Sequence, residues 1–276
     1  MTKKKLTKYM SFVVKILICA VFIAPFYISL VYSTKSREET IQTGLAFPTR
    51  IHWENFTRAI DVSNFWNATK NSLIITVIGV FLILAVCSMA AYVIARNNNS
   101  KFYNSLYYIF LGALLLPFQV VMLPLYVQLK DLHLLNTRIG MVLTIAGLQI
   151  AYNVFVYTGF VKGIPREMDE AAYIDGAGKF RTFWSIIFPL MKPINSSAMV
   201  LNALALWNEF QASLIIAQKN ELRTIPLTQF YFFGQYSIEL NMAFAAFVLA
   251  MIPIIILYLL MQRYIVSGIM SGAVKG

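Results

Sequence analysis

The stretch SLIITVIGVFLILAVCSMAAYVIA, residues 72–95, decides the fold class of this chain. It contains no charged residue, and its apolar residues neither alternate with polar ones nor form a single stripe. A helix of this length, rising about 1.5 Å per residue, is long enough to cross a hydrocarbon layer about 30 Å thick. We therefore predict that residues 72–95 form a transmembrane helix.

The rest of the chain has the same character. Of its 276 residues, 59% are hydrophobic and 13% are charged, which lies outside the balance of soluble domains. A β-barrel would need shorter segments of alternating apolar and polar residues, and the apolar runs here lack that alternation. Six runs are long enough to span a membrane as helices: 16–32, 72–95, 103–125, 139–161, 194–217 and 244–264. The sequence therefore predicts an all-α membrane protein with six transmembrane helices.

The distribution of Lys and Arg predicts the orientation, because these residues are retained on the cytoplasmic side of short loops. With the N-terminus inside, the inner segments hold 14 of the 23 basic residues: Lys3, Lys4, Lys5, Lys8, Lys15, Arg96, Lys101, Lys162, Arg166, Lys179, Arg181, Lys192, Arg263 and Lys275. The other nine are outside, five of them in the long segment 35–70, where the rule is weaker. We expect both termini to be cytoplasmic. The net charge of +11 does not indicate nucleic acid, because the basic residues are scattered beside the membrane ends.

The inner segment 162–193 is the most polar long stretch between two apolar runs. Pro165 suits the first turn of a helix, which we expect to run to Asp175. Gly176 follows where helices often end in a left-handed residue. A second short helix is expected to carry Phe180, Phe183, Trp184 and Ile187 on one face and to end at Pro189. Composition alone equally favours an ordinary interfacial loop with aromatic anchors.

The spacing in this segment adds a resemblance to a known family. Glu170-Ala171-Ala172, then Gly176, and then Ile186, Phe188 and Pro189 resemble the EAA loop of the membrane subunits of ABC importers, with Phe188 in place of the usual Leu. The resemblance implies a cytoplasmic helix-turn-helix coupling loop that docks into a cleft of the ATPase, with the Glu pairing to a basic residue there. The ATPase-coupling residues it implies are Glu170, Ala171, Ala172, Asp175, Gly176, Ala177, Phe183 and Pro189.

The resemblance extends along nearly the whole chain. PFYISLVYSTK from Pro25, NSLIITV from Asn71, LLPFQVVMLPLYVQLKDLHLLNT from Leu115, WNEF from Trp207 and the closing SGIMSGAVKG are similar to the second permease subunit of carbohydrate importers, the maltose-type G subunit. Residues 1–276 would then form a single transmembrane domain of the type I importers. The resemblance also implies that the cytoplasmic tail 265–276 contacts the ATPase subunits, whereas without it a frayed terminus is the simpler expectation. Its contacting residues would be Gly272, Ala273, Val274, Lys275 and Gly276.

The function that the resemblance implies is ATP-driven, binding-protein-dependent import of a carbohydrate, of which an oligosaccharide is our expected class. The implied partners are a second, non-identical permease, two ATP-binding subunits, an extracytoplasmic sugar-binding protein and the lipid of a bacterial plasma membrane. This chain has no GxxxxGK[ST] phosphate loop. We therefore expect no enzymatic activity and no cofactor in it, with ATP and Mg held by the partner ATPase.

Polar residues within the predicted spans are candidates for a substrate pathway, because they are costly unless they face protein or water. These candidates are Gln119, Gln149, Tyr152, Asn153, Asn202, Trp207 and Asn208, with Gln211 nearby. Hydrogen bonding between helices is the commoner use of such residues, so both alternatives stay open. Glu209 is expected to be paired or near the outer interface.

The outer segment 218–242 is rich in aromatic residues. By resemblance it corresponds to a loop that faces the binding protein, and the residues we expect to take part are Thr228, Tyr231, Phe232, Gly234 and Gln235. Aromatic packing at the level of the lipid headgroups is the alternative.

Three other functions fit the sequence less well. An ion-coupled secondary transporter would need ionisable residues at membrane depth or matching broken helices in two halves, and neither is evident. A membrane-embedded enzyme or metal site would need clustered ligands, but His52 and His133 lie in outer loops, and Cys19 and Cys87 lack ligand spacing. An ABC permease for another solute would share the EAA loop but not the sugar-type tail.

Overall fold

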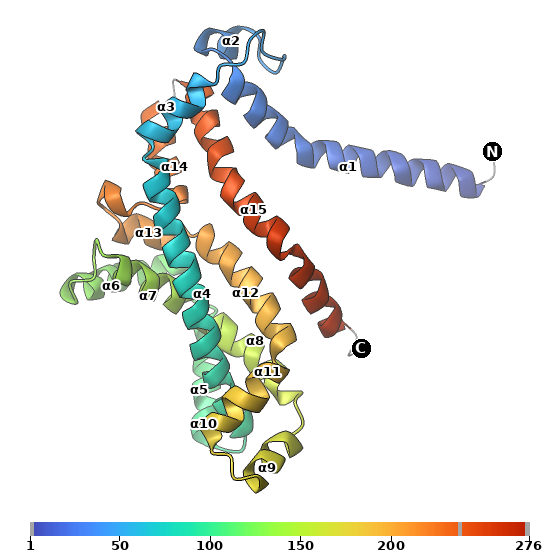
Figure 1. Ribbon diagram of the computed structural model, residues 1–276, viewed down its shortest axis with the longest axis vertical. Helices are drawn as coiled ribbons and strands as arrows, with labels where there is room; N and C mark the ends of the chain where they lie inside the picture. Colours follow the sequence, from blue (N-terminus) through green and yellow to red (C-terminus); the bar gives the residue numbers. More distant parts are fainter. Residues whose placement is uncertain (1–2, 237–238, 274–276) are drawn as a thin grey trace. The chain divides into compact units, whose positions relative to one another are not determined.

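The computed structural model describes residues 3–236 and 239–273, and within these ranges the chain folds into helices joined by turns, with no strand (Figure 1). The chain divides into two compact units, Met1–Trp66 with Thr228–Pro253, and Asn67–Leu227 with Ile254–Gly276. Helices α4 and α15 each contribute residues to both units. The all-α class that the sequence predicts is confirmed.

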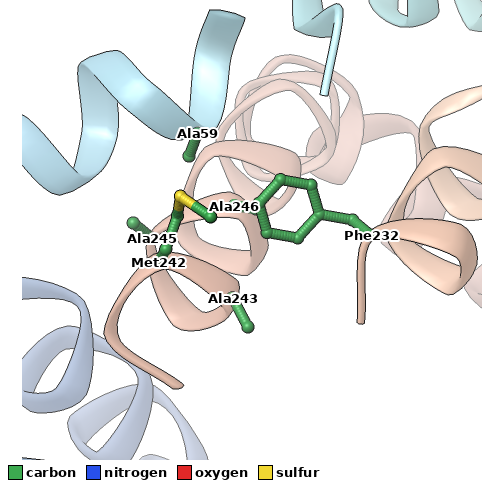
Figure 2. Close-up of a cluster of buried hydrophobic side chains, with 6 residues drawn as sticks. All are labelled: Ala59, Phe232, Met242, Ala243, Ala245 and Ala246. Atoms are coloured by element: carbon green, nitrogen blue, oxygen red, sulfur yellow. The ribbon is translucent and has the colours of Figure 1, made fainter. Parts of the chain in front are cut away.

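The first unit contains the N-terminal helix and the outer segments. Its helices are α1 (Lys3–Thr34), α2 (Arg37–Gln42), α3 (Glu54–Val62), most of α14 (Ile225–Tyr236) and the first part of α15 (Leu240–Ala273). The core of this unit is a cluster of Ala59, Phe232, Met242, Ala243, Ala245 and Ala246, each at most 4% exposed. Figure 2 shows the ring of Phe232 pointing toward Met242 and Ala246, with Ala59 next to the Met242 sulfur. The small side chains of α15 allow α3 and α14 to pack closely against it.

Buried polar contacts also hold the first unit together. The Lys35 side chain is fully buried, and its Nζ donates hydrogen bonds to Thr43 Oγ1 at 2.7 Å and to the Gly44 carbonyl at 2.6 Å. The Asn55 side chain of α3 donates from Nδ2 to the Lys35 carbonyl at 2.8 Å, and its Oδ1 accepts from Asn241 Nδ2 at 2.8 Å. Because unpaired polar groups are costly to bury, these bonds specify how the outer segment folds back on α1.

The second unit contains the remaining helices. They are α4 (Phe65–Arg96), α5 (Lys101–Ala113), α6 (Phe118–Asp131), α7 (Arg138–Leu148), α8 (Ile150–Lys162), α9 (Glu167–Ile174), α10 (Lys179–Thr182), the π-helical turn η1 (Phe183–Ile187), α11 (Phe188–Leu190), α12 (Lys192–Trp207), α13 (Gln211–Ile216) and the short turn η2 (Asn220–Leu222). Helices α5 and α8 pack side by side, and α13 packs on α6 and α7. A Cβ on Gly79 of α4 would lie 2.4 Å from Leu206 Cδ2 of α12, so a glycine lets these two helices approach closely.

Three of the six predicted spans are long continuous helices. The apolar helical stretches Met10–Thr34, Phe65–Arg96 and Leu240–Leu260 are each long enough to cross a membrane, and the count rises to five if each of two bent helix pairs is one span. The bent pairs are α5 with α6, at 106°, and α7 with α8, at 46°. The chain is therefore a helical membrane protein with three to five candidate spans among the residues described.

The predicted helix 103–125 is interrupted, and proline explains why. Helix α5 ends at Ala113, and Pro117 precedes α6 with an extended backbone at φ −67° and ψ 143°. Proline lacks the N–H needed to continue a helix and pushes the preceding residue out of the helical region. The predicted helix 139–161 bends at Gln149 for a different reason, since the Gln149 N–H bonds to the carbonyl of Ala146, three residues back, in a tighter turn.

The predicted helix 194–217 is interrupted as well. Helix α12 ends at Trp207, after 16 residues, and α13 begins at Gln211. Glu209 explains the new start, because its carboxylate accepts hydrogen bonds from the Ala212 N–H at 2.7 Å and from the Ser213 N–H at 3.1 Å. These N–H groups have no partner in the first turn of a helix, so the side chain takes the place of a preceding turn. Glu209 is thus paired, as expected.

The predicted cytoplasmic tail is only partly within the described structure. Gly272 and Ala273 are the last residues of α15. Val274, Lys275 and Gly276 lie outside the described residues.

Candidate functional site

The polar segment 162–193 folds at one end of α4, where Figure 1 shows α9, α10 and α11. Helix α9 covers Glu167–Ile174, within the helix expected from the sequence, and carries three acidic residues in its first turn, where the helix dipole favours negative charge. After the capping residue Asp175, the turn is made by Gly176, whose φ is +76°. The N–H of Gly176 bonds to the Tyr173 carbonyl and that of Ala177 to the Ala172 carbonyl, which is the Schellman pattern of a glycine-terminated helix.

The second half of this segment differs from the prediction at Pro189. Instead of ending there, helical geometry continues from α10 through η1 and α11 to Leu190. The Phe188 N–H bonds to the carbonyl of Phe183, five residues back, and so forms a π-turn. This wider turn accommodates Pro189, whose ring would otherwise meet the carbonyl four residues before it. The helix stops instead at Met191, immediately before α12.

An aromatic cluster joins this second half to α4. The ring centroids of Phe183 and Tyr92 lie 5.3 Å apart, and those of Phe183 and Trp184 lie 5.0 Å apart. Trp184 also packs on Phe188 at 4.8 Å. Because Phe183 is 3% exposed, it serves as the hydrophobic anchor of the segment.

A charged cluster joins the first half of the segment to α4. Arg96 Nη2 lies 2.8 Å from Asp169 Oδ2, and the two side chains are 13% and 21% exposed. The Tyr92 hydroxyl donates a hydrogen bond to Asp169 Oδ1. Tyr92 and Arg96 are one helical turn apart on α4, so both reach the same carboxylate. We call Tyr92, Arg96 and Asp169 the α4–α9 clamp.

The clamp also reaches the end of α8. Arg96 Nη1 donates to the carbonyls of Ile164, at 3.0 Å, and Val161, at 3.4 Å. Helix α8 ends at Lys162, and cations are favourable beside the carbonyls at the C-terminal end of a helix. Nearby, Arg166 Nη2 donates to Asn98 Oδ1 at 2.9 Å. The short connection between α8 and α9 is therefore bonded at two points, through the Ile164 carbonyl to Arg96 and through the Arg166 side chain to Asn98.

Glu170, next to Asp169 on α9, has a contrasting environment. Successive residues of a helix point about 100° apart, so the two carboxylates face different directions. Glu170 is exposed, and within residues 3–236 and 239–273 its carboxylate makes no hydrogen bond or ion pair. Together with Tyr173 and Phe180 it borders a groove of about 820 Å³ formed by α4, α5, α9 and α10.

The structure brings most of the predicted coupling residues onto one short element. Ala171, Asp175 and Gly176 are exposed on α9 and the turn after it, and Ala177 is half-buried. Ala172 is buried, as is Phe183, and Pro189 is exposed on α11. The predicted set thus separates into outward-facing residues, centred on Glu170, and inward-facing ones that hold the element in place.

The polar residues of the predicted spans divide in the same way. Asn153 of α8 and Asn202 of α12 are buried and form a reciprocal amide pair, with Nδ2 to Oδ1 distances of 2.9 and 2.7 Å. Asn202 Nδ2 also donates to the Ala198 carbonyl at 2.8 Å. Trp207 is 4% exposed. These three side chains are buried within their own chain.

The other four pathway candidates reach the surface of the chain. Gln119, Tyr152 and Asn208 are exposed, and Gln149, between α7 and α8, is half-buried. Asn208 Nδ2 donates to the Leu204 carbonyl at 2.9 Å.

The predicted outer loop forms helix α14 in the structure. Thr228 and Phe232 are buried, and Phe232 belongs to the core of the first unit. Gly234 and Gln235 are exposed, while Tyr231 is half-buried. The helix thus exposes only part of the residue set predicted for this segment.

Sequence reasoning missed the clamp. A signal was present in the chain, because Arg96 closes a long apolar run one helical turn after Tyr92 and Asp169 immediately precedes the EAA pattern. Both charges were predicted on the same side of the membrane, but nothing in the sequence indicates which of the three acidic residues of α9 meets Arg96.

The chain is similar to a family of membrane transport components and to individual transport proteins. Residues 87–271 match the model of a family described as the binding-protein-dependent transport system inner membrane component. The chain is 38% identical over 275 residues to the probable starch degradation products transport system permease protein AmyC of Thermoanaerobacterium thermosulfurigenes, covering 100% of both chains. It is 32% identical to the melibiose/raffinose/stachyose import permease protein MelC of Bacillus subtilis, covering 99% of each.

A solved structure has the same fold. The crystal structure of a bacterial ABC transporter involved in the import of the acidic polysaccharide alginate contains a chain that matches with a TM-score of 0.80 and 22% identity, covering 96% of this chain and 98% of that one. The family match covers more than half of the chain, and the relatives match along its whole length. Among the described residues, no group of three or more His, Cys, Asp and Glu side chains is placed to hold a metal ion. The chain belongs to the binding-protein-dependent transport system inner membrane components, the multi-pass permease subunits of ABC importers, which work with an ATPase and a binding protein rather than as enzymes.

Proposed function

We propose that this chain is the permease subunit of an oligosaccharide importer and forms one half of its translocation pathway. The observation that carries this proposal is the full-length similarity to two permeases whose names specify starch degradation products and melibiose, raffinose and stachyose. These are di- to tetrasaccharides or fragments of a glucose polymer. A short oligosaccharide is therefore the substrate class of this chain.

The coupling site of this permease is the segment 162–193. An exposed, unpaired Glu170 on a helix that the clamp and Phe183 hold against α4 supports this assignment, because a rigidly held charge can transmit force from a partner. Glu170 pairs with a basic residue of the ATPase, and Gly176 makes the turn. Asp175, Ala171 and Ala177 complete the docking surface.

The assembly contains a second, non-identical permease, two ATP-binding subunits and an extracytoplasmic sugar-binding protein. Residues 1–276 act as one transmembrane domain with six spans, in which each bent helix pair counts once and α12 with α13 is the sixth. Both termini are cytoplasmic, as the excess of Lys and Arg on the inner segments indicates. The tail 265–276 contacts the ATPase.

The sugar pathway uses the polar residues that reach the surface of the chain. Gln119, Gln149, Tyr152 and Asn208 have the exposure that a sugar contact needs, since amides suit hydroxyls and an aromatic face suits a sugar ring. Asn153, Asn202 and Trp207 are buried and stabilise the packing of the helices that carry the pathway residues. On the outer side, the exposed part of α14, with Gly234 and Gln235, faces the binding protein.

A reconstitution tests this function. We would purify the complex from its native membrane, identify its subunits, and measure ATP-dependent uptake of radiolabelled maltotriose and raffinose into proteoliposomes with the binding protein present. We expect a second permease and an ATPase to co-purify, and one of the two sugars to be imported. Glu170→Ala should abolish uptake and loosen the ATPase while membrane insertion stays normal.

Two outcomes would contradict the proposal. If the chain purifies alone under mild conditions, the assembly is wrong. If the complex forms but imports neither sugar, and instead takes up a non-carbohydrate solute, the substrate class is wrong. Deleting residues 272–276 should lower sugar-stimulated ATPase activity, and unchanged stimulation would remove the tail from the ATPase contact.

A further inference from the structure

We propose that the α4–α9 clamp is the positioning element that makes the coupling helix and α4 move as one body. This inference rests on the proposed function, because it concerns how force from the ATPase reaches the membrane helices. It assigns roles to Tyr92, Arg96 and Asp169, none of which was among the coupling residues predicted from the sequence.

The side chain of Arg96 connects α4 to both α8 and α9. One guanidinium joins three elements, because Nη2 pairs with Asp169 of α9 while Nη1 bonds the carbonyls of Val161 and Ile164 at the end of α8. A planar guanidinium holds several acceptors in a fixed geometry, which a lysine cannot do. Displacing α9 therefore pulls on both α4 and α8.

The clamp is largely shielded from solvent and is continuous with the aromatic cluster around Phe183. Arg96 and Asp169 are 13% and 21% exposed, so the pair is screened less than one on the surface. The Tyr92 hydroxyl occupies the other oxygen of Asp169, and the Tyr92 ring packs on Phe183 in the second half of the loop. The clamp is thus continuous with the aromatic anchor, and both halves of the loop are joined to the same turn of α4.

The clamp lies directly beside Glu170 in the sequence. Asp169 and Glu170 are adjacent in sequence, so a force applied at the exposed carboxylate acts on the helix one residue away from its attachment to α4. A longer lever arm would allow α9 to rotate or bend without moving α4. The geometry assigns Glu170 to contact with the ATPase and Asp169 to transmission of the movement.

The test separates transmission from docking. In the reconstituted full complex we would measure ATP hydrolysed per sugar imported, using whichever of maltotriose and raffinose the wild type transports, together with the amount of bound ATPase. Asp169→Asn keeps the size of the side chain but removes its charge. We expect the ATPase to remain bound and the ratio of ATP to sugar to rise about tenfold, within the usual range of coupling between sites.

Two further variants test the pair itself. Arg96→Gln should give at least the same rise, because it also loses the bonds to the Val161 and Ile164 carbonyls. The double variant Arg96→Gln with Asp169→Asn should be no worse than Arg96→Gln alone, because the contact between the two residues is then already lost. Tyr92→Phe should give a smaller rise. Glu167→Gln removes a charge from the same exposed turn without breaking the clamp, so its ratio should equal that of the wild type.

The outcomes that would overturn the inference differ from those that would overturn the proposed function. If Glu170→Ala abolishes uptake but Asp169→Asn keeps the wild-type ratio, the coupling loop stands and the clamp does not. Additive effects of Arg96→Gln and Asp169→Asn would likewise reject the pair. Loss of the ATPase from Asp169→Asn would show that the residue acts in docking. If Glu170→Ala behaves as wild type, the coupling loop itself is rejected.

Discussion

Two polar regions of the second unit differ in whether their polar side chains find partners within the chain. On α9, Asp169 is paired inside the protein while the neighbouring Glu170 is exposed and unpaired. Between α8 and α12, Asn153 and Asn202 satisfy each other in a buried pair. A polar group whose partner lies in its own chain specifies the packing of helices. A charge left exposed on a firmly held helix is available to a partner from outside.

This contrast changes how the polar residues of a membrane protein are interpreted. The sequence marks Asn153 and Glu170 equally, as polar residues in or beside apolar runs. The structure separates them by the partners that their oxygens and nitrogens find. Substitutions in the two regions should therefore fail in different ways, one in transport and the other in stability.

The largest effect is expected in the turn of the coupling loop. Gly176→Pro should abolish uptake, because proline requires φ near −65° where the structure has +76°, and because it removes the N–H that bonds to Tyr173. The measurement is sugar uptake in proteoliposomes, with membrane insertion checked by immunoblot. Gly178→Ala is the matched control, since Gly178 has φ −71° and open space around its Cα. Normal uptake by Gly176→Pro would show that the turn is not part of the coupling path.

An intermediate effect is expected in the buried amide pair. Asn153→Leu leaves the Asn202 amide without its partner and should lower the free energy of unfolding by about 0.5–2 kcal/mol, the range for hydrogen bonds between membrane helices. The melting temperature of the detergent-solubilised protein measures this change. Uptake per folded molecule should stay within about twofold of the wild type, since both amides are buried and neither is exposed to a sugar.

The double variant sharpens this second prediction. Asn153→Leu with Asn202→Leu should cost less than the sum of the two single variants, because no buried amide is then left unpaired. If uptake of the chosen sugar falls in either single variant while the melting temperature is unchanged, Asn153 and Asn202 contact the substrate, and the contrast drawn above does not hold.

The smallest effect is expected at Glu209. Glu209→Gln keeps an oxygen to accept one N–H at the start of α13 but loses the charge that the helix dipole favours, so the protein should lose about 0.3–1 kcal/mol. A small drop in melting temperature with unchanged uptake would fit a helix-capping role. A strong loss of uptake at unchanged stability would instead place Glu209 in the sugar pathway.

Much of the fold and part of the site could be predicted from the sequence. The apolar runs predicted the helical membrane class, because crossing a hydrocarbon layer requires continuous apolar helices. The spacing of Glu170, Gly176 and Pro189 predicted the coupling loop and led to the family to which the chain belongs. Gly176 takes the predicted left-handed turn because that conformation depends on a single residue and its neighbours.

The positions where helices break were harder to predict from the sequence. Pro117 ends a helix by its own chemistry and is a local signal, yet Glu209 breaks one by capping the next, and the π-turn before Pro189 lets a helix continue where proline alone predicts an end. Each of these outcomes depends on which acceptor a backbone N–H group bonds to. The local sequence shows which hydrogen bonds are possible but not which of them forms.

The sequence by itself determined the membrane class and the family, and it singled out the segment proposed to meet the ATPase, because these follow from apolar length and from the spacing of a few residues. Only the tertiary structure decided which carboxylate of α9 is held by Arg96 and which is left exposed, and which amides pair across helices. Those choices depend on distances between residues far apart in the chain, such as Arg96 and Asp169 or Asn153 and Asn202. The balance between a buried pair and an exposed charge is set by the packing of whole helices.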